Sequence, residues 1–164
     1  MKARKSLSVL LAETEARAAE AASIAGMCAA YGRIMASHDR SMGKPLASLS
    51  KVLTSVSRDL CAVHDVTEAG MMLEMETGDI WEPEKEMDIF ESIQNECAGY
   101  VQILDCLAEQ WESAGFQADA ARIRRVSKEL AGYCLHIASL YNAAYICTRQ
   151  GCWNQGRVME WRNA

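Results

Sequence analysis

The sequence predicts an all-α protein in which four long helices form an up-down-up-down antiparallel bundle; two helical hairpins that pair in a dimer are the alternative. The main observation is a seven-residue repeat with two apolar positions, which is clear over three stretches and imperfect over a fourth. Such a repeat marks helices that pack on other helices. The second observation is composition. Half of the 164 residues are hydrophobic, and only two are proline and ten glycine, so a core can be buried with few breaks in the chain.

The repeat predicts helices at about residues 4–38, 45–77, 83–114 and 117–149, which form one domain over 1–150, followed by a C-terminal tail over 151–164. The first helix is rich in alanine and has the imperfect rows. Arg17 interrupts one row and Thr14 the other. The rows consist of Leu10, Ile24 and Tyr31, and of Leu7, Ala21, Cys28 and Met35.

The other three predicted helices each carry two regular rows, which we expect to lie in the core. In the second helix the rows are Leu46, Leu53 and Leu60 beside Leu49, Val56 and Val63. In the third they are Phe90, Cys97, Leu104 and Trp111 beside Ile93, Tyr100, Leu107 and Ala114. In the fourth they are Ile123, Leu130, Ile137 and Ala144 beside Val126, Tyr133, Leu140 and Cys147.

Glycine and proline fall between these helices. Gly43 and Pro45 separate the first pair, Gly78 and Pro83 the second, and Gly115 the last. Proline is tolerated at the first position of a helix, and glycine is favoured just beyond its end. Because the connections are short, consecutive helices are expected to be antiparallel neighbours.

Charge and cysteine content restrict the class of protein. The net charge is −5, which argues against a nucleic-acid partner and against peripheral binding to an acidic membrane. The seven cysteines are an odd number and mostly lie on apolar faces, which indicates free thiols in a reducing, cytoplasmic compartment. No apolar stretch is long enough for a transmembrane helix.

The sequence holds no motif for a metal, a cofactor or catalysis. Ferritin-like sites need Glu-x-x-His pairs, and none of the three histidines has a glutamate three residues before it. Cys61, His64 and Glu68 share one helical face, but they lack the paired spacing of a zinc site, and we interpret them as boundary and solvated residues. We therefore expect no cofactor, no metal ligand and no catalytic residue, and we favour a protein that is not an enzyme.

Acidic residues crowd the second predicted turn. Between Glu68 and Glu91 there are nine acids and one lysine, interleaved with methionine and tryptophan. We favour a solvated turn whose apolar residues close the end of the bundle. The alternative is an adaptable surface for a partner protein, which with two tryptophans of the tail would comprise Met71, Met72, Met75, Trp81, Glu82, Glu84, Glu86, Trp153 and Trp161.

The fourth predicted helix carries the opposite charge in its first half, where four basic residues are candidates for contact with an anion: Arg122, Arg124, Arg125 and Lys128. Asp119 and Glu129 flank them, and no aromatic residues are interleaved. A nucleic-acid interface usually has such aromatics or a larger basic surface, so we favour a solvated face.

Short stretches resemble parts of sorting-nexin BAR domains: Tyr31-Gly32-Arg33, and Asp79-Ile80-Trp81 followed by Glu84-Lys85. This resemblance implies a membrane-associated dimer of long helices with a basic concave face. The likeness covers less than half of the chain, which is acidic overall. We therefore treat it as a similarity between long helices in general.

Three functions follow as expectations. The first is a protein that acts by binding another protein or by self-assembly, as a scaffold or a small regulator or inhibitor, with a homodimer as the simplest assembly. The second is a BAR-like membrane-associated dimer. The third is a helical bundle that binds a metal or another ligand.

Overall fold

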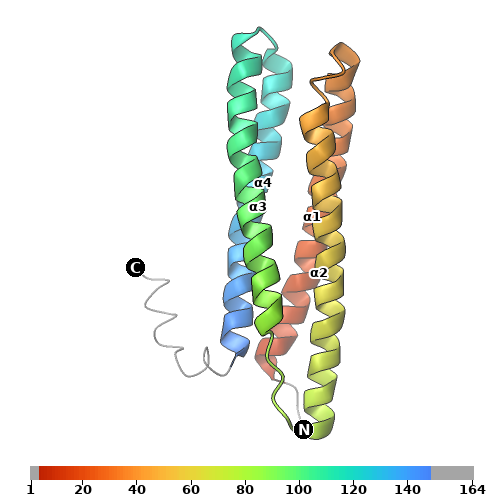
Figure 1. The fold of residues 1–164 in the computed structure, drawn as a ribbon, viewed down its shortest axis with the longest axis vertical. Helices are drawn as coiled ribbons and strands as arrows, with labels where there is room; N and C mark the ends of the chain where they lie inside the picture. Colours follow the sequence, from red (N-terminus) through yellow and green to blue (C-terminus); the bar gives the residue numbers. More distant parts are fainter. Residues whose placement is uncertain (1–3, 149–164) are drawn as a thin grey trace, which may run out of the picture.

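The computed structural model describes residues 4–148, which form four helices and contain no strand. The helices are α1 (Lys5–His38), α2 (Lys44–Thr77), α3 (Glu84–Ser113) and α4 (Gln117–Cys147). They lie side by side along one long axis, and each runs opposite to the next (Figure 1). The predicted all-α helical bundle is confirmed. The predicted tail at 151–164, with Trp153 and Trp161, lies outside the described residues.

The apolar rows form the core. All six row residues of α2 and all eight of α4 are buried. In α1 the interruption at Thr14 is only apparent, because its side chain is buried and its hydroxyl donates a hydrogen bond to the Leu10 carbonyl oxygen at 2.6 Å. In α3 the rows loosen towards the helix end, where Trp111 is half-buried and Ala114 is exposed.

The bundle consists of two hairpins that meet mainly through one pair of helices. α1 packs along α2, and α3 packs along α4; α1 also packs against α4, whereas α2 and α3 scarcely touch. A groove of about 430 Å³ therefore lies between α2 and α3, with Val52, Val56, Ile89 and Ile93 among its lining residues. The fold is a four-helix bundle that is open along one side (Figure 1).

Small residues bring α1 and α2 close together. Ala18, Ala25 and Gly32 recur every seven residues on α1 and are buried. From α2 the Ser57 hydroxyl donates to the Ala18 carbonyl oxygen at 2.8 Å, and the Ser50 hydroxyl donates to that of Ala25 at 2.9 Å. These small residues form a third row on α1, which a search for large apolar residues does not detect. The row fixes the register of α1 against α2.

Charged side chains connect the hairpins at both ends of the bundle, through His38 and Asp119 at one end and through an Arg4 hydrogen bond at the other. At one end Asp119 of α4 is buried, 3.0 Å from His38 Nδ1 and 2.6 Å from an Arg122 nitrogen. At the other end Arg4 forms a 3.0 Å ion pair with Glu74 and donates a 2.8 Å hydrogen bond to the Cys147 carbonyl oxygen. These contacts hold α1 and α4 together at both ends of the bundle.

Burial of thiol and phenol groups predicts a loss of stability in alkali. Burial raises the pKa of the Cys28 thiol from 9.0 to about 12 and also raises the pKa of the Tyr133 hydroxyl. Above the unfolded-state value of 9.0 for the thiol, the unfolded chain binds fewer protons than the folded one, so stability falls as pH rises. For Cys28 alone the loss is up to about 1.4 kcal/mol per pH unit.

Urea unfolding at about pH 8 and at about pH 10 measures this effect, since only the second lies within the window between the two pKa values. Cys28→Ala is the matched variant, and its stability should fall less between the two pH values than that of the wild type. A wild-type stability that stays constant or rises at the higher pH would contradict the burial of these groups.

Candidate functional site

The end of α2 is the part of the bundle with the most exposed apolar surface. In Figure 1 the last turns of α2 extend beyond the start of α3, and the chain runs back along residues 78–83. These turns have no α3 beside them. Four large apolar side chains are exposed here within nine residues, by 44–55%, and we call them the α2-end surface: Met72, Leu73, Met75 and Ile80.

Acidic residues surround the α2-end surface. Glu76, Asp79 and Glu84 are exposed, whereas Glu74 and Glu86 are buried. The buried Glu74 is already neutralised by its ion pair with Arg4. The exposed acids therefore set the charge that an approaching molecule meets, and this charge is negative.

Trp81 occupies a different position from that of a free anchor residue. It is half-buried and packs against the core, with its indole over Gly70: a β-carbon at Gly70 would lie 2.6 Å from Trp81 Cγ. Arg4 donates a hydrogen bond to the Trp81 carbonyl oxygen, and the Trp81 N–H donates to Glu74 at 3.4 Å. Trp81 is thus packed against the core beside the α2-end surface and is not a freely exposed member of it.

The other residues of the predicted surface that the structure describes are also partly buried and partly exposed. Met71 is half-buried and packs against the core, with its sulfur 3.9 Å from the Ser8 hydroxyl oxygen of α1. Glu82 is half-buried, and Met72, Met75 and Glu84 are exposed. The structure thus brings Met72, Met75 and Glu84 to the surface around the turn. Leu73 and Ile80 were missed because sequence alone does not show how far α2 extends past α3 along the axis of the bundle.

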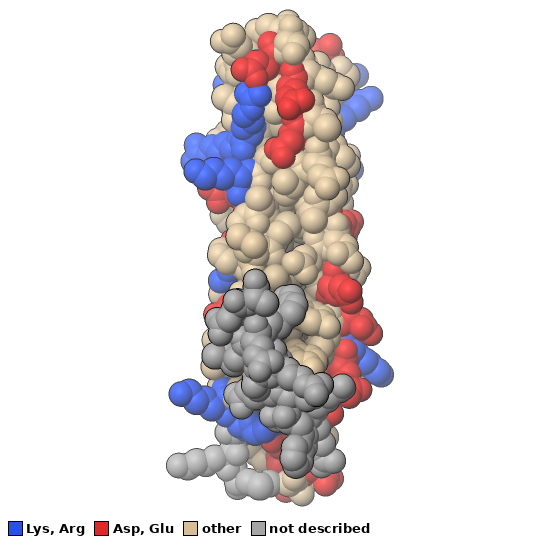
Figure 2. Space-filling model, turned by 90° about the vertical axis from the view of Figure 1, so that its left-hand side faces the viewer, with Lys and Arg blue, Asp and Glu red and all other residues tan. Residues whose placement is uncertain are grey.

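The predicted basic cluster lies near the opposite end of the bundle. Arg122 pairs with Asp119, and Arg124 pairs with Glu112 of α3. Arg125 and Lys128 are exposed. Figure 2, which views the α3/α4 side, shows basic side chains near the top with acids beside them and a largely uncharged middle. Among the described residues visible in this view, lysine and arginine form no continuous run of the kind that a BAR-like membrane contact needs.

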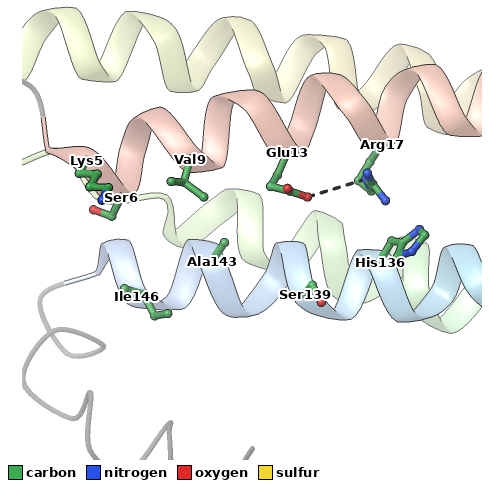
Figure 3. A pocket seen from close by; sticks show the side chains of 9 residues that line it. All are labelled: Lys5, Ser6, Val9, Glu13, Arg17, His136, Ser139, Ala143 and Ile146. Atoms are coloured by element: carbon green, nitrogen blue, oxygen red, sulfur yellow. Dashed lines mark ion pairs between the residues drawn. The ribbon is translucent and has the colours of Figure 1, made fainter.

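A second hollow lies between α1 and α4. It measures about 720 Å³ and is lined by residues that include Val9, Glu13 and Arg17 of α1 and His136 and Ala143 of α4 (Figure 3). Its charges are largely matched within the chain, since Arg17 lies 3.9 Å from Glu13 (Figure 3).

Glu20 lies next to the charged end of this hollow. It was not among the residues predicted from the sequence. Glu20 lies 2.8 Å from an Arg17 nitrogen and 2.8 Å from His136 Nδ1. The pairing joins residues 116 positions apart, and only the interruption of a core row by Arg17 hinted at it. Acids and bases are thus paired at this end of the hollow, and the exposed Lys5 is the charged lining residue at the other end (Figure 3).

One cluster has the composition of a metal site. The ligand atoms of His64, Asp65 and Glu68 lie within 4.8 Å of one another, and no other such group occurs among residues 4–148. Two of the three side chains belong to exposed residues, and His64 Nδ1 lies 3.5 Å from an Asp65 oxygen. The third member of this group is Asp65 and not Cys61. Exposed groups of this kind are common on helix surfaces, and we assign them no metal function.

The fold and surfaces define the class of protein as an all-α bundle of two hairpins. One end of the bundle exposes apolar side chains together with acidic ones. Comparison of the chain with protein-family models, with curated protein sequences and with solved structures found no match. Within residues 4–148, none of the helices combines the length and the apolar composition needed to cross a lipid bilayer.

Proposed function

We propose that the protein acts by binding a partner protein through the α2-end surface. The observation that supports this proposal is the exposure of Met72, Leu73, Met75 and Ile80 together, at the one end where the chain turns and α2 lacks a neighbouring α3. Single exposed apolar residues are ordinary, but several within a short segment that also carries exposed acids favour an interaction surface. Methionine side chains also adapt to the shape of a partner.

The charge of this end favours a partner of opposite sign. Exposed Glu76, Asp79 and Glu84 surround the apolar residues, so the complementary partner is an amphipathic helix with an apolar face and flanking lysines or arginines. Attraction between opposite charges speeds association and selects the partner, while the apolar contact supplies most of the affinity.

A synthetic amphipathic peptide of leucine and lysine, titrated into the full-length protein by calorimetry, tests this proposal. The double variant Met72→Ser/Met75→Ser should bind the peptide at least about tenfold more weakly, since each truncated anchor costs roughly 1 kcal/mol. Raising the salt concentration from about 0.05 M to about 0.5 M should weaken wild-type binding, because screening removes the charge attraction.

Leu135→Ser is the matched control. Leu135 on α4 is the most exposed large apolar residue described, at 71%, and lies outside the α2-end surface, so its replacement should leave the affinity unchanged. Equal affinities for the wild type and the double variant would contradict the proposal. So would a loss of affinity in Leu135→Ser as large as that in the double variant.

Self-association is a second candidate, and the groove between α2 and α3 favours it. The scarcity of α2–α3 contacts leaves Ile89 exposed in a groove whose lining mixes apolar residues with serines and acids, and a second copy could cover it. Sedimentation velocity separates the two candidates. A mass that doubles with concentration and returns to that of a monomer in Ile89→Asp supports a dimer through this groove.

We also propose a reducing, cytoplasmic location. Among the described cysteines, Cys61 and Cys106 are free thiols with exposed side chains. Exposed free thiols persist where cellular reductants keep them reduced.

A further inference from the structure

Two cysteines face each other across the second hairpin. Cys97 lies on α3 and Cys134 on α4, and their thiols lie close enough for hydrogen bonding between them to shift both pKa values. The register of the hairpin agrees with this contact. Nearer the α3–α4 turn, the Ser127 hydroxyl of α4 donates to Asp105 of α3 at 2.6 Å, and in both pairs the two residues lie at nearly equal chain distances from the turn.

The environments of the two thiols differ. Cys97 is fully buried, whereas Cys134 is half-buried. Of the residues one turn away from Cys134 on α4, Leu130 and Ile137 are buried in the core, whereas Ala131 and Ala138 are too short to cover its sulfur. A small molecule in solution can therefore reach Cys134 more easily than Cys97.

Hydrogen bonding between the two thiols also shifts their pKa values in opposite directions. Hydrogen bonding with the Cys97 thiol lowers the pKa of Cys134 from 9.0; burial opposes this shift. The same hydrogen bond, together with burial, raises the pKa of Cys97. Cys134 is thus the thiol that more readily becomes a thiolate, which is the nucleophilic form.

We propose that Cys134 and Cys97 form a redox-active thiol pair that a low-molecular-weight disulfide such as glutathione disulfide oxidises. The Cys134 thiolate attacks one sulfur of that disulfide, forms a mixed disulfide and releases one thiolate. Cys97 then attacks the Cys134 sulfur, breaks the mixed disulfide and gives its proton to the second departing thiolate. The cysteine pair loses two electrons and two protons, and the small disulfide is reduced to two thiols.

The other described cysteines provide contrasts. Burial raises the pKa of Cys28 to about 12, so this thiol stays protonated and inaccessible. Cys61 and Cys106 are exposed, so a small disulfide can reach them, but each should stop at a mixed disulfide. The expected signature of the pair is therefore an internal cross-link rather than reactivity alone.

The test is to treat the reduced, full-length protein with excess glutathione disulfide, block the remaining thiols with an alkylating agent and map the peptides by mass spectrometry. In the wild type, peptides containing Cys97 and Cys134 should be cross-linked, lighter by two hydrogen atoms, and separated again by dithiothreitol. Cys97→Ser should instead accumulate glutathione on Cys134, because no second thiol resolves the intermediate. Cys134→Ser should leave Cys97 unmodified.

Cys106→Ser is the matched control, since it removes an exposed cysteine of α3 and should leave the cross-link intact. Circular dichroism of each variant establishes that it is folded, and Cys97→Ala replaces Cys97→Ser if the serine variant unfolds. Absence of the Cys97–Cys134 cross-link in the wild type would overturn the proposal. Glutathione on Cys97 in a folded Cys134→Ser variant would overturn the assignment of Cys134 as the attacking thiol.

Discussion

Leu130→Ala is expected to lower the free energy of unfolding by about 2–5 kcal/mol, the range for removing a large aliphatic side chain from a packed core. Leu130 lies in the middle of α4 with none of its surface exposed. Its neighbours come from the interior rows of the bundle, which cannot collapse into the space without moving a long helix. Urea unfolding followed by circular dichroism measures the loss.

Leu135→Ala is the control on the same helix. The side chain removed is identical, but Leu135 is 71% exposed, so the change should stay within about 0.5 kcal/mol. The difference between the two variants isolates burial from helix propensity. Similar losses in both would mean that α4 presents a different face to the core from the one described.

Gly43→Ala is expected to destabilise the first hairpin by about 1–3 kcal/mol, the usual cost of forcing an extra carbon into a packed contact. A β-carbon at Gly43 would meet the Gly32 carbonyl oxygen and would lie 2.7 Å from the Ala36 Cβ. The obstructing atoms are backbone or close to backbone, so no flexible side chain can turn aside. Relief therefore requires α1 and α2 to separate.

Gly99→Ala in α3 is the matched control for this substitution. A β-carbon at Gly99 would meet nothing within 4 Å, and alanine is favoured over glycine in a helix by up to about 1 kcal/mol. Thermal unfolding should therefore give a lower Tm for Gly43→Ala and an equal or higher Tm for Gly99→Ala. A Gly43→Ala variant at least as stable as the wild type would contradict the close approach of α1 and α2.

Most of the fold could be predicted because the seven-residue repeat reports directly on which helical face is buried. The rows of α2 and α4 are buried throughout, and the four helices begin and end within two residues of the expected ranges. The repeat could not show which helices pair most closely. It treats all four as equivalent, whereas small residues such as Ala18 and Ala25 close the α1–α2 contact and α2 and α3 remain apart.

The candidate site was predictable only in outline. Composition indicated an acidic end rich in methionine, but it could not show that Trp81 packs over Gly70 while Met72 and Met75 remain exposed. That division depends on how far α2 extends past α3 along the axis of the bundle, which is a tertiary property. The contact between Cys97 and Cys134 likewise depends on the register of α3 against α4.

The central claim is that the α2-end surface is where a partner binds, and hydrogen–deuterium exchange with and without the leucine–lysine peptide tests it most directly. Bound peptide should slow exchange of backbone amides over residues 71–82 and leave residues 117–128, at the far end of the bundle, unchanged. Protection confined to the α1–α4 or α2–α3 grooves, or an exchange pattern that the peptide does not alter, would contradict the claim.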